Sequence, residues 1–95
     1  MRITLCARSK ILQILEPGKC FRIQAVGTIQ AGAHIDLIPN EEFLPGDSII
    51  SHIPKVVVDF QTAVLLANQI IDYDYENEEF IISNRGLKND SASTN

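Results

Sequence analysis

The sequence predicts a single, mainly β domain with α+β character, in which two short helices accompany the strands. Three observations predict it. The chain has 95 residues, of which 45% are hydrophobic, which is enough for one globular core. From Cys20 onward, apolar and polar residues alternate with the two-residue period of strands. Residues 7–16 and 60–67 lack that alternation and are predicted to be helical.

The first elements are a short strand or helix lead-in at residues 3–5 and an amphipathic helix at residues 7–16. Apolar side chains recur in this helix with helical spacing, at Ile11, Leu12, Ile14 and Leu15. The residue that caps its start is Ser9, Cys6 or Ala7. Pro17-Gly18 ends it, because proline cannot continue the hydrogen-bond ladder and glycine accepts the cap conformation.

Two strands follow, at residues 20–27 and 33–37, and the short glycine-containing link between them predicts a hairpin. Phe21, Ile23 and Ala25 share one face of the first strand, whereas Arg22, Gln24 and Val26 share the other. His34 lies on the polar face of the second strand. Residues 39–42 and 45–47 are predicted turns.

The second half begins with a strand at residues 48–53, which Pro54 ends. Residues 56–58 are three consecutive valines, typical of a strand buried on both faces. Asp59 is a natural N-cap for the second helix, with Val64 and either Leu65 or Leu66 facing inward. Residues 70–75 and 79–83 form a last strand pair.

The domain is predicted to span residues 1–84. Residues 85–95, RGLKNDSASTN, contain almost no apolar side chains. They cannot bury enough surface to offset the entropy lost on ordering, so we expect a mobile C-terminal tail.

The composition disfavours several functions. The net charge is −4, and the eight basic residues form no cluster, which argues against binding to nucleic acid or acidic membranes. The N-terminus lacks the apolar run of a signal peptide, and no apolar segment is long enough to span a bilayer. With two cysteines and no CxxC spacing, we expect a cytoplasmic protein with reduced thiols.

One stretch, KVVVDFQTAVLLANQIIDY at residues 55–73, resembles the HesB/IscA (A-type iron–sulfur carrier) family pattern KVVVD-x-x-S-x-x-x-L-x-G-x-x-IDY. Thr62 stands for the serine and Asn68 for the glycine. The following segment EFIISN resembles the family's GF-x-hydrophobic-x-N-P strand. In residues 21–37, Phe21-Arg22-Ile23 resembles the L-R-hydrophobic entry, and Gly32 matches the last glycine of the family's G-C-S-G loop. The resemblance covers nearly the whole chain.

This resemblance implies a HesB-like sandwich of two small mixed β-sheets, and homodimers or higher homo-oligomers. It also implies three cysteine ligands for iron or an iron–sulfur cluster, one in the loop and two in a C-terminal C-G-C. Here Gln30 occupies the first position, and Ser91 and Ser93 occupy the others. Because clusters are held by soft thiolates, we expect no family-type cluster.

Other candidate sites are weaker. Cys20, Cys6 and His34 are conceivable ligands for a metal or a cluster, but a free cysteine more often behaves as a small buried hydrophobe. The densest charge on the chain is an acidic group around a predicted hairpin turn: Asp72, Asp74, Glu76, Glu78 and Glu79. A solvated hairpin is the simpler interpretation, and a docking surface for a basic partner is the alternative.

No motif for nucleophilic catalysis or nucleotide binding is present, so we expect no enzyme. Three functions stay open. The first is a divergent HesB-like binding or regulatory module without a cluster, which contacts iron–sulfur assembly proteins. The second is an iron or cluster carrier with other ligands, Cys20 foremost. The third is an unrelated β-domain with a structural or interaction role.

Overall fold

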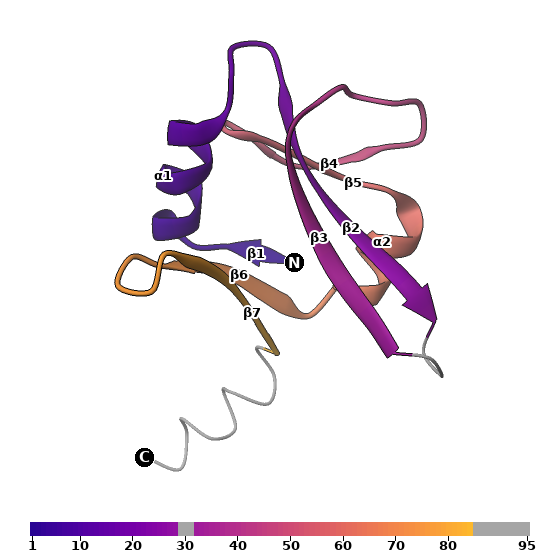
Figure 1. Ribbon diagram of the computed structural model, residues 1–95. Coiled ribbons are helices and arrows are strands. Elements are labelled where there is room, and N and C mark those ends of the chain that lie inside the picture. The colour runs from indigo at the N-terminus through magenta and orange to yellow at the C-terminus, as the bar shows by residue number, and fades with distance from the viewer. Residues whose placement is uncertain (29–31, 85–95) are drawn as a thin grey trace.

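The structure, a computed structural model, describes residues 1–28 and 32–84. Within them the chain forms seven strands and two helices (Figure 1). In chain order they are β1 (Arg2–Ile3), α1 (Leu5–Ile14), β2 (Cys20–Thr28), β3 (Gly32–Glu41), β4 (Ser48–His52), β5 (Lys55–Val58), α2 (Phe60–Leu65), β6 (Gln69–Asp74) and β7 (Glu79–Asn84).

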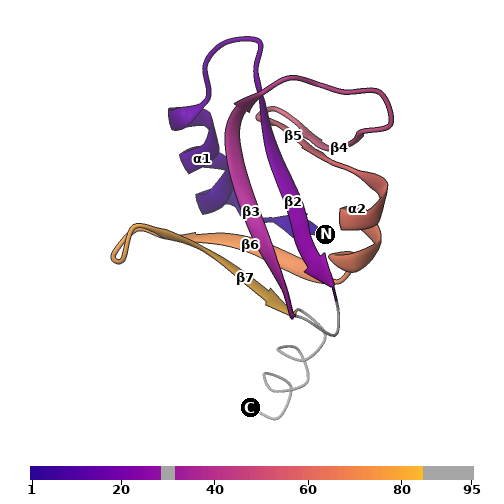
Figure 2. The ribbon, with the colours of Figure 1, turned by 45° about the vertical axis from the view of Figure 1, so that its right-hand side comes forward.

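The strands form two mixed sheets, with the orders β3-β2-β5-β4 and β1-β6-β7. β5 is parallel to β2 and antiparallel to β4, whereas β6 is parallel to β1 and antiparallel to β7. The helices α1 and α2 lie at opposite sides of the two sheets in both views (Figures 1 and 2). The predicted mainly β domain with two short helices is confirmed.

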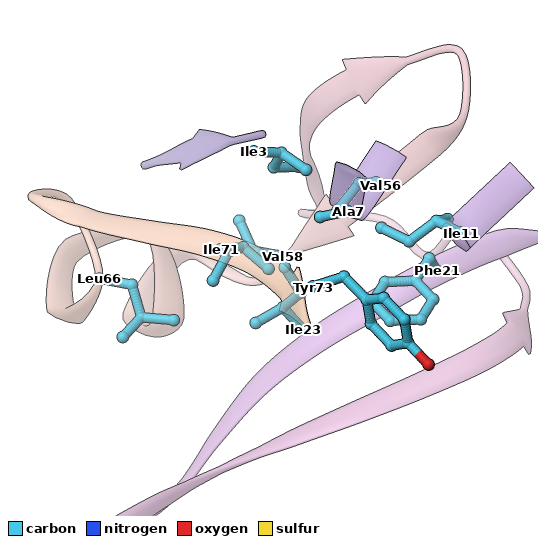
Figure 3. Close-up of a cluster of buried hydrophobic side chains, with 10 residues drawn as sticks. All are labelled: Ile3, Ala7, Ile11, Phe21, Ile23, Val56, Val58, Leu66, Ile71 and Tyr73. Carbon is cyan, nitrogen blue, oxygen red and sulfur yellow. The ribbon is translucent and has the colours of Figure 1, made fainter. Parts of the chain in front are cut away.

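The core lies between the sheets and is closed by both helices (Figure 3). It takes side chains from strands of both sheets, from α1 and from the residue that ends α2. Its members are Ile3, Ala7, Ile11, Phe21, Ile23, Val56, Val58, Leu66, Ile71 and Tyr73. Val57 is also fully buried, so the prediction that residues 56–58 are buried on both faces is confirmed.

Helix α1 begins two residues earlier than predicted. Its N-cap is Thr4 rather than Ser9, Cys6 or Ala7, and the Thr4 hydroxyl accepts a hydrogen bond from the Ala7 amide at 3.2 Å. The same hydroxyl donates to Asp72 of β6 at 2.5 Å. Asp72 is 68 residues away in the chain, so local sequence could not indicate which residue caps the helix.

The predicted turn at residues 39–42 is wrong, because β3 continues to Glu41 along β2. Pro39 is tolerated there since β3 is the edge of its sheet and needs no outward N–H. The turn-like composition has one local consequence. Asn40 adopts a left-handed conformation, and its side chain accepts a hydrogen bond from the Glu16 amide at 2.8 Å.

Helix α2 starts as predicted, but it presents a different face to the core. The Asp59 carboxylate accepts a hydrogen bond from the Thr62 amide at 2.7 Å, which confirms the cap. Val64 was expected to face inward and is 62% exposed, whereas Thr62 and Leu66 are buried. The Thr62 hydroxyl accepts a hydrogen bond from the Ala25 amide of β2 at 2.9 Å. This bond sets the rotation of the helix.

Candidate functional site

The three positions that the family resemblance assigns to cluster ligands lie outside the described residues. Gln30 belongs to the connection between β2 and β3, next to the last described pair, Thr28 and Gly32. Ser91 and Ser93 follow the end of β7. The chain enters both segments at the same end of the molecule, at the bottom of both views (Figures 1 and 2). The described fold therefore brings the starts of the two segments to one end.

The structure separates the weaker metal candidates. Cys20 is buried at the start of β2 and pairs with Glu41, whereas His34 is exposed on β3 and pairs with Val26. Six strand positions separate the two pairs, which corresponds to about 20 Å at a rise of 3.3 Å per residue. Cys20 and His34 of one chain thus cannot bind the same metal ion.

Cys6 lies in the first turn of α1, where its side chain is exposed and its carbonyl accepts a hydrogen bond from the Tyr75 hydroxyl at 3.3 Å. Asp36 on the same strand lies 3.5 Å from the His34 ring. Among residues 1–28 and 32–84, no three His, Cys, Asp or Glu side chains gather as a metal site would require. The three candidates are not brought together.

The acidic group divides into structural and exposed members. Asp72 is partly buried and accepts hydrogen bonds from the Thr4 hydroxyl and the Tyr73 amide. Asp74 forms the hairpin turn, because its carboxylate accepts from the amides of Glu76 and Asn77 and from the Asn77 side chain. The hydrogen bond from the Asn77 side chain is the main cause that lowers the Asp74 pKa. The carboxylates of Asp72 and Asp74 therefore already accept hydrogen bonds from within the chain.

Glu76, Glu78 and Glu79 are exposed at the tip of the β6–β7 hairpin. Glu79 lies directly opposite Asp74 in the strand register, so two carboxylates of like charge are neighbours there. A binding surface for a basic partner would consist of these three side chains rather than of all five.

An ionic cluster on β2 was missed by the sequence interpretation. Arg22 lies on the face opposite the core, as expected, but it is buried. Its guanidinium donates to both carboxylate oxygens of Asp47, at 2.8 and 2.7 Å, and to the Glu42 carbonyl at 2.9 Å. Its Nε lies 3.4 Å from the Glu41 carboxylate and has no hydrogen bond among the described residues. The cluster holds the β3–β4 loop against the sheet.

Electrostatics around this cluster follow from these contacts. The hydrogen bond from Arg22, more than any other cause, lowers the pKa of Asp47, and a further bond from the Leu44 amide at 2.7 Å acts in the same direction. Nothing in the local sequence pairs an arginine in a strand with an aspartate 25 residues later. The cluster is structural, since the two Arg22 Nη atoms and the Asp47 carboxylate are bound by one another and by the backbone, although the buried Nε has no hydrogen bond among the described residues.

The surface also carries apolar side chains. On α2, Phe60 is 76% exposed, Val64 lies one turn after it and is also exposed, and Leu65 is exposed as well; the helix has no charged residue. A shallow hollow of about 240 Å³ opens between the N-terminus and the residues after α2, lined by Met1, Arg2, Ala67, Asn68 and Gln69. No helix in the described part of the chain is long and apolar enough to cross a membrane.

The comparison with solved structures identifies the architecture. A crystal structure of IscA with the 2Fe-2S cluster superimposes with a TM-score of 0.68, covering 87% of this chain and 83% of that one. The fold is that of IscA. The sequence identity is 23%, so the likeness concerns the fold, and the predicted sandwich of two small mixed sheets is confirmed in this form.

Comparisons of the sequence alone found no relative. No protein-family model matches the chain, and no curated protein matches it. The likeness to the IscA fold is therefore recognised from the strand order and packing, together with the short sequence patterns noted above.

Proposed function

We propose that this protein is a divergent HesB/IscA-like binding or regulatory module related to iron–sulfur cluster biosynthesis, without catalytic activity of its own. The fold supports the relationship. The observation that carries the proposal is the donor set at the three family ligand positions, where Gln30, Ser91 and Ser93 replace cysteines.

These donors do not fit an iron–sulfur cluster. Cluster irons are held by soft thiolates, which are anionic. A glutamine amide is a neutral, weakly donating oxygen, and a serine hydroxyl stays protonated near neutral pH. The chain therefore keeps the scaffold of a carrier while it lacks the chemistry that retains the cargo.

Anaerobic reconstitution with ferrous iron and sulfide tests the proposal. We expect the wild-type protein to be colourless after desalting. The matched positive control is the triple variant Gln30→Cys, Ser91→Cys and Ser93→Cys, which we expect to retain a visible chromophore. A stable chromophore on the wild-type protein, at about one per monomer or dimer, would contradict the proposal.

The alternative is an iron or cluster carrier that uses other ligands, Cys20 foremost. Cys20 is only 2% exposed, so a metal could reach it only if β2 or the adjoining loop opened. Comparing iron binding to Cys20→Ser with binding to Cys6→Ser tests this alternative. If neither substitution changes the iron content, the two cysteines are not the iron ligands and this alternative is wrong.

The partners that we propose are iron–sulfur assembly proteins, namely cysteine desulfurase, a scaffold or a ferredoxin. The exposed apolar side chains of α2, Phe60, Val64 and Leu65, support a binding role, since exposed apolar surface is typical of protein contacts. Titration of each purified protein against the wild type and against Val64→Ser tests it. Val64 is exposed, so its loss should weaken binding without unfolding the domain. Absence of binding to all three favours the third interpretation, an unrelated interaction or structural protein.

A homo-oligomer and a cytoplasmic location are parts of the same proposal. Cys6 and Cys20 are both free thiols, which agrees with a reducing compartment. Fractionation of cells from the source organism, with detection of the untagged protein, tests the location.

A further inference from the structure

The free end of the β2–β3 hairpin extends beyond the rest of its sheet. β5 pairs with β2 only as far as Val58, which lies opposite Ile23. Past that point β3 is the only strand partner of β2 among the described residues, with residues 25–28 opposite residues 32–35. Both views show these strand ends projecting past β5 (Figures 1 and 2). We call residues 25–28 and 32–35 the β2–β3 arm.

A single hydrogen bond joins this arm to another element within residues 1–28 and 32–84. The Ala25 amide, at the base of the arm, donates to the Thr62 hydroxyl of α2 at 2.9 Å. Farther along the arm, Val26 and His34 are exposed, whereas Ile35 at the base packs against the core. Segments with few buried contacts open locally at low free energy. The position of the arm therefore depends largely on its base, where Thr62 binds.

Thr62 is itself held by the start of α2. Its side chain is fully buried, and its amide donates a hydrogen bond to the Asp59 carboxylate at 2.7 Å. The Thr62 hydroxyl then accepts from Ala25, so two hydrogen bonds in series connect the N-cap of α2 to the base of the arm. The arm can therefore keep its position only while the first turn of α2 keeps its shape.

The first turn of α2 is also accessible from outside. Helix α2 has only six residues, and a helix of this length is not stable without its cap and its tertiary contacts. Phe60, the first residue of the helix, lies between Asp59 and Thr62 in the chain and is 76% exposed. A molecule that contacts the Phe60 ring thus acts directly on the turn that holds Thr62.

We propose that the first turn of α2 is a latch for the β2–β3 arm, with Thr62 as the residue that positions the arm. While Asp59 caps the turn, the Thr62 hydroxyl binds Ala25 and the arm is held in one place. When the turn unwinds, the Ala25 amide loses its acceptor, and the arm pivots where the pairing of β2 with β5 ends. A partner protein that binds Phe60 and changes this turn thereby moves the arm. The latch does not rest on the proposed function; only its use by a partner does.

Distances between two spin labels, measured by double electron–electron resonance, test the latch. One label is attached to the arm at His34→Cys and the other to α1 at Gln13→Cys. Both positions are exposed, the background is Cys6→Ser, and Cys20 is too buried to react. We expect one narrow distance distribution for the protein with the latch intact. Thr62→Val and Asp59→Ala should each broaden this distribution about twofold, because the arm is released.

Two further variants separate a positioning role from a loss of stability. Thr62→Ser keeps the acceptor for the Ala25 amide, so its distribution should stay narrow although the lost methyl group weakens the fold. Asp74→Ala removes a carboxylate that accepts backbone amides in the β6–β7 turn rather than in α2, and it should also leave the distribution unchanged. Equal widths for the intact protein and Thr62→Val, or equal broadening by Asp74→Ala, would overturn the proposal.

The use of the latch by a partner is tested with the same labels. Whichever of cysteine desulfurase, scaffold or ferredoxin binds in the titrations above should change the distance distribution of the intact protein and leave that of Thr62→Val unaltered. Binding without any change in the intact protein would refute this use of the latch. If none of the three binds, the proposed function loses its support, whereas the latch is still decided by the variants alone.

Discussion

Arg22 of β2 binds Asp47 through two parallel hydrogen bonds, with Nη1–Oδ1 at 2.8 Å and Nη2–Oδ2 at 2.7 Å. Both side chains are buried, and the pair joins a central strand to the loop before β4. Planar arginine–carboxylate pairs of this kind are strong and directional. The pair therefore anchors this loop to the sheet.

Removal of the carboxylate charge should destabilise the protein. We expect Asp47→Asn to lower the free energy of unfolding by about 2–3 kcal/mol, because it leaves the buried guanidinium with only the more exposed Glu41 carboxylate as a counter-ion. Glu41→Gln is the control. Its carboxylate contacts Arg22 outside hydrogen-bond geometry and is more exposed, so the loss should stay below about 1 kcal/mol. Urea denaturation monitored by circular dichroism measures both, and equal losses would contradict the assigned role.

The same pair predicts a pH dependence. The Asp47 pKa is lowered in the folded state from its usual value of 3.8. A carboxylate with a lowered pKa stabilises the folded state fully above the unfolded pKa, and this contribution is lost as the pH falls through the folded value. The free energy of unfolding should therefore fall below about pH 4. The decline should be shallower for Asp47→Asn, and identical pH profiles for the two proteins would refute the linkage.

Thr62 should matter through its hydroxyl rather than its size. Thr62→Val keeps the volume but leaves the Ala25 amide without an acceptor, which should cost about 1–3 kcal/mol. Thr62→Ser keeps the acceptor and should cost about 1 kcal/mol for the lost methyl group. Hydrogen exchange of the Ala25 amide gives a direct readout, with protection lost in the valine variant and retained in the serine variant.

The β6–β7 hairpin should respond to salt through Asp74 and Glu79. These carboxylates are cross-strand neighbours, so their repulsion weakens the hairpin at low ionic strength. We expect Glu79→Gln to increase the amide protection of this hairpin at low salt and to remove most of its salt dependence. Asp74→Ala should instead reduce protection of the Glu76 and Asn77 amides at any salt concentration, because it removes their acceptor. A salt response unchanged in Glu79→Gln would show that the repulsion is unimportant.

Local patterns were sufficient for most of the secondary structure. The valine run at residues 56–58 indicated a strand buried on both faces, and Asp59 indicated the start of α2; both are confirmed. Such signals depend only on neighbouring residues, whose side-chain periodicity and capping chemistry act within one or two turns.

Features that depend on distant partners were not predictable in this way. Thr4 caps α1 while held by Asp72, and Val64 is exposed because Thr62 binds β2. β3 continues through Pro39 because β2 pairs with it over its whole length. Each of these outcomes is decided by a hydrogen bond between residues far apart in the chain, and no local propensity encodes it.

For the candidate site, the sequence by itself determined the donor chemistry, because Gln30, Ser91 and Ser93 are not thiolates in any fold. Only the tertiary structure decided that Cys20 and His34 lie about 20 Å apart, that Arg22 is buried against Asp47, and that β7 is an edge strand of its sheet. The physical reason is that donor chemistry belongs to a side chain alone. Distance, burial and free backbone groups arise only when strands separated in sequence pack together.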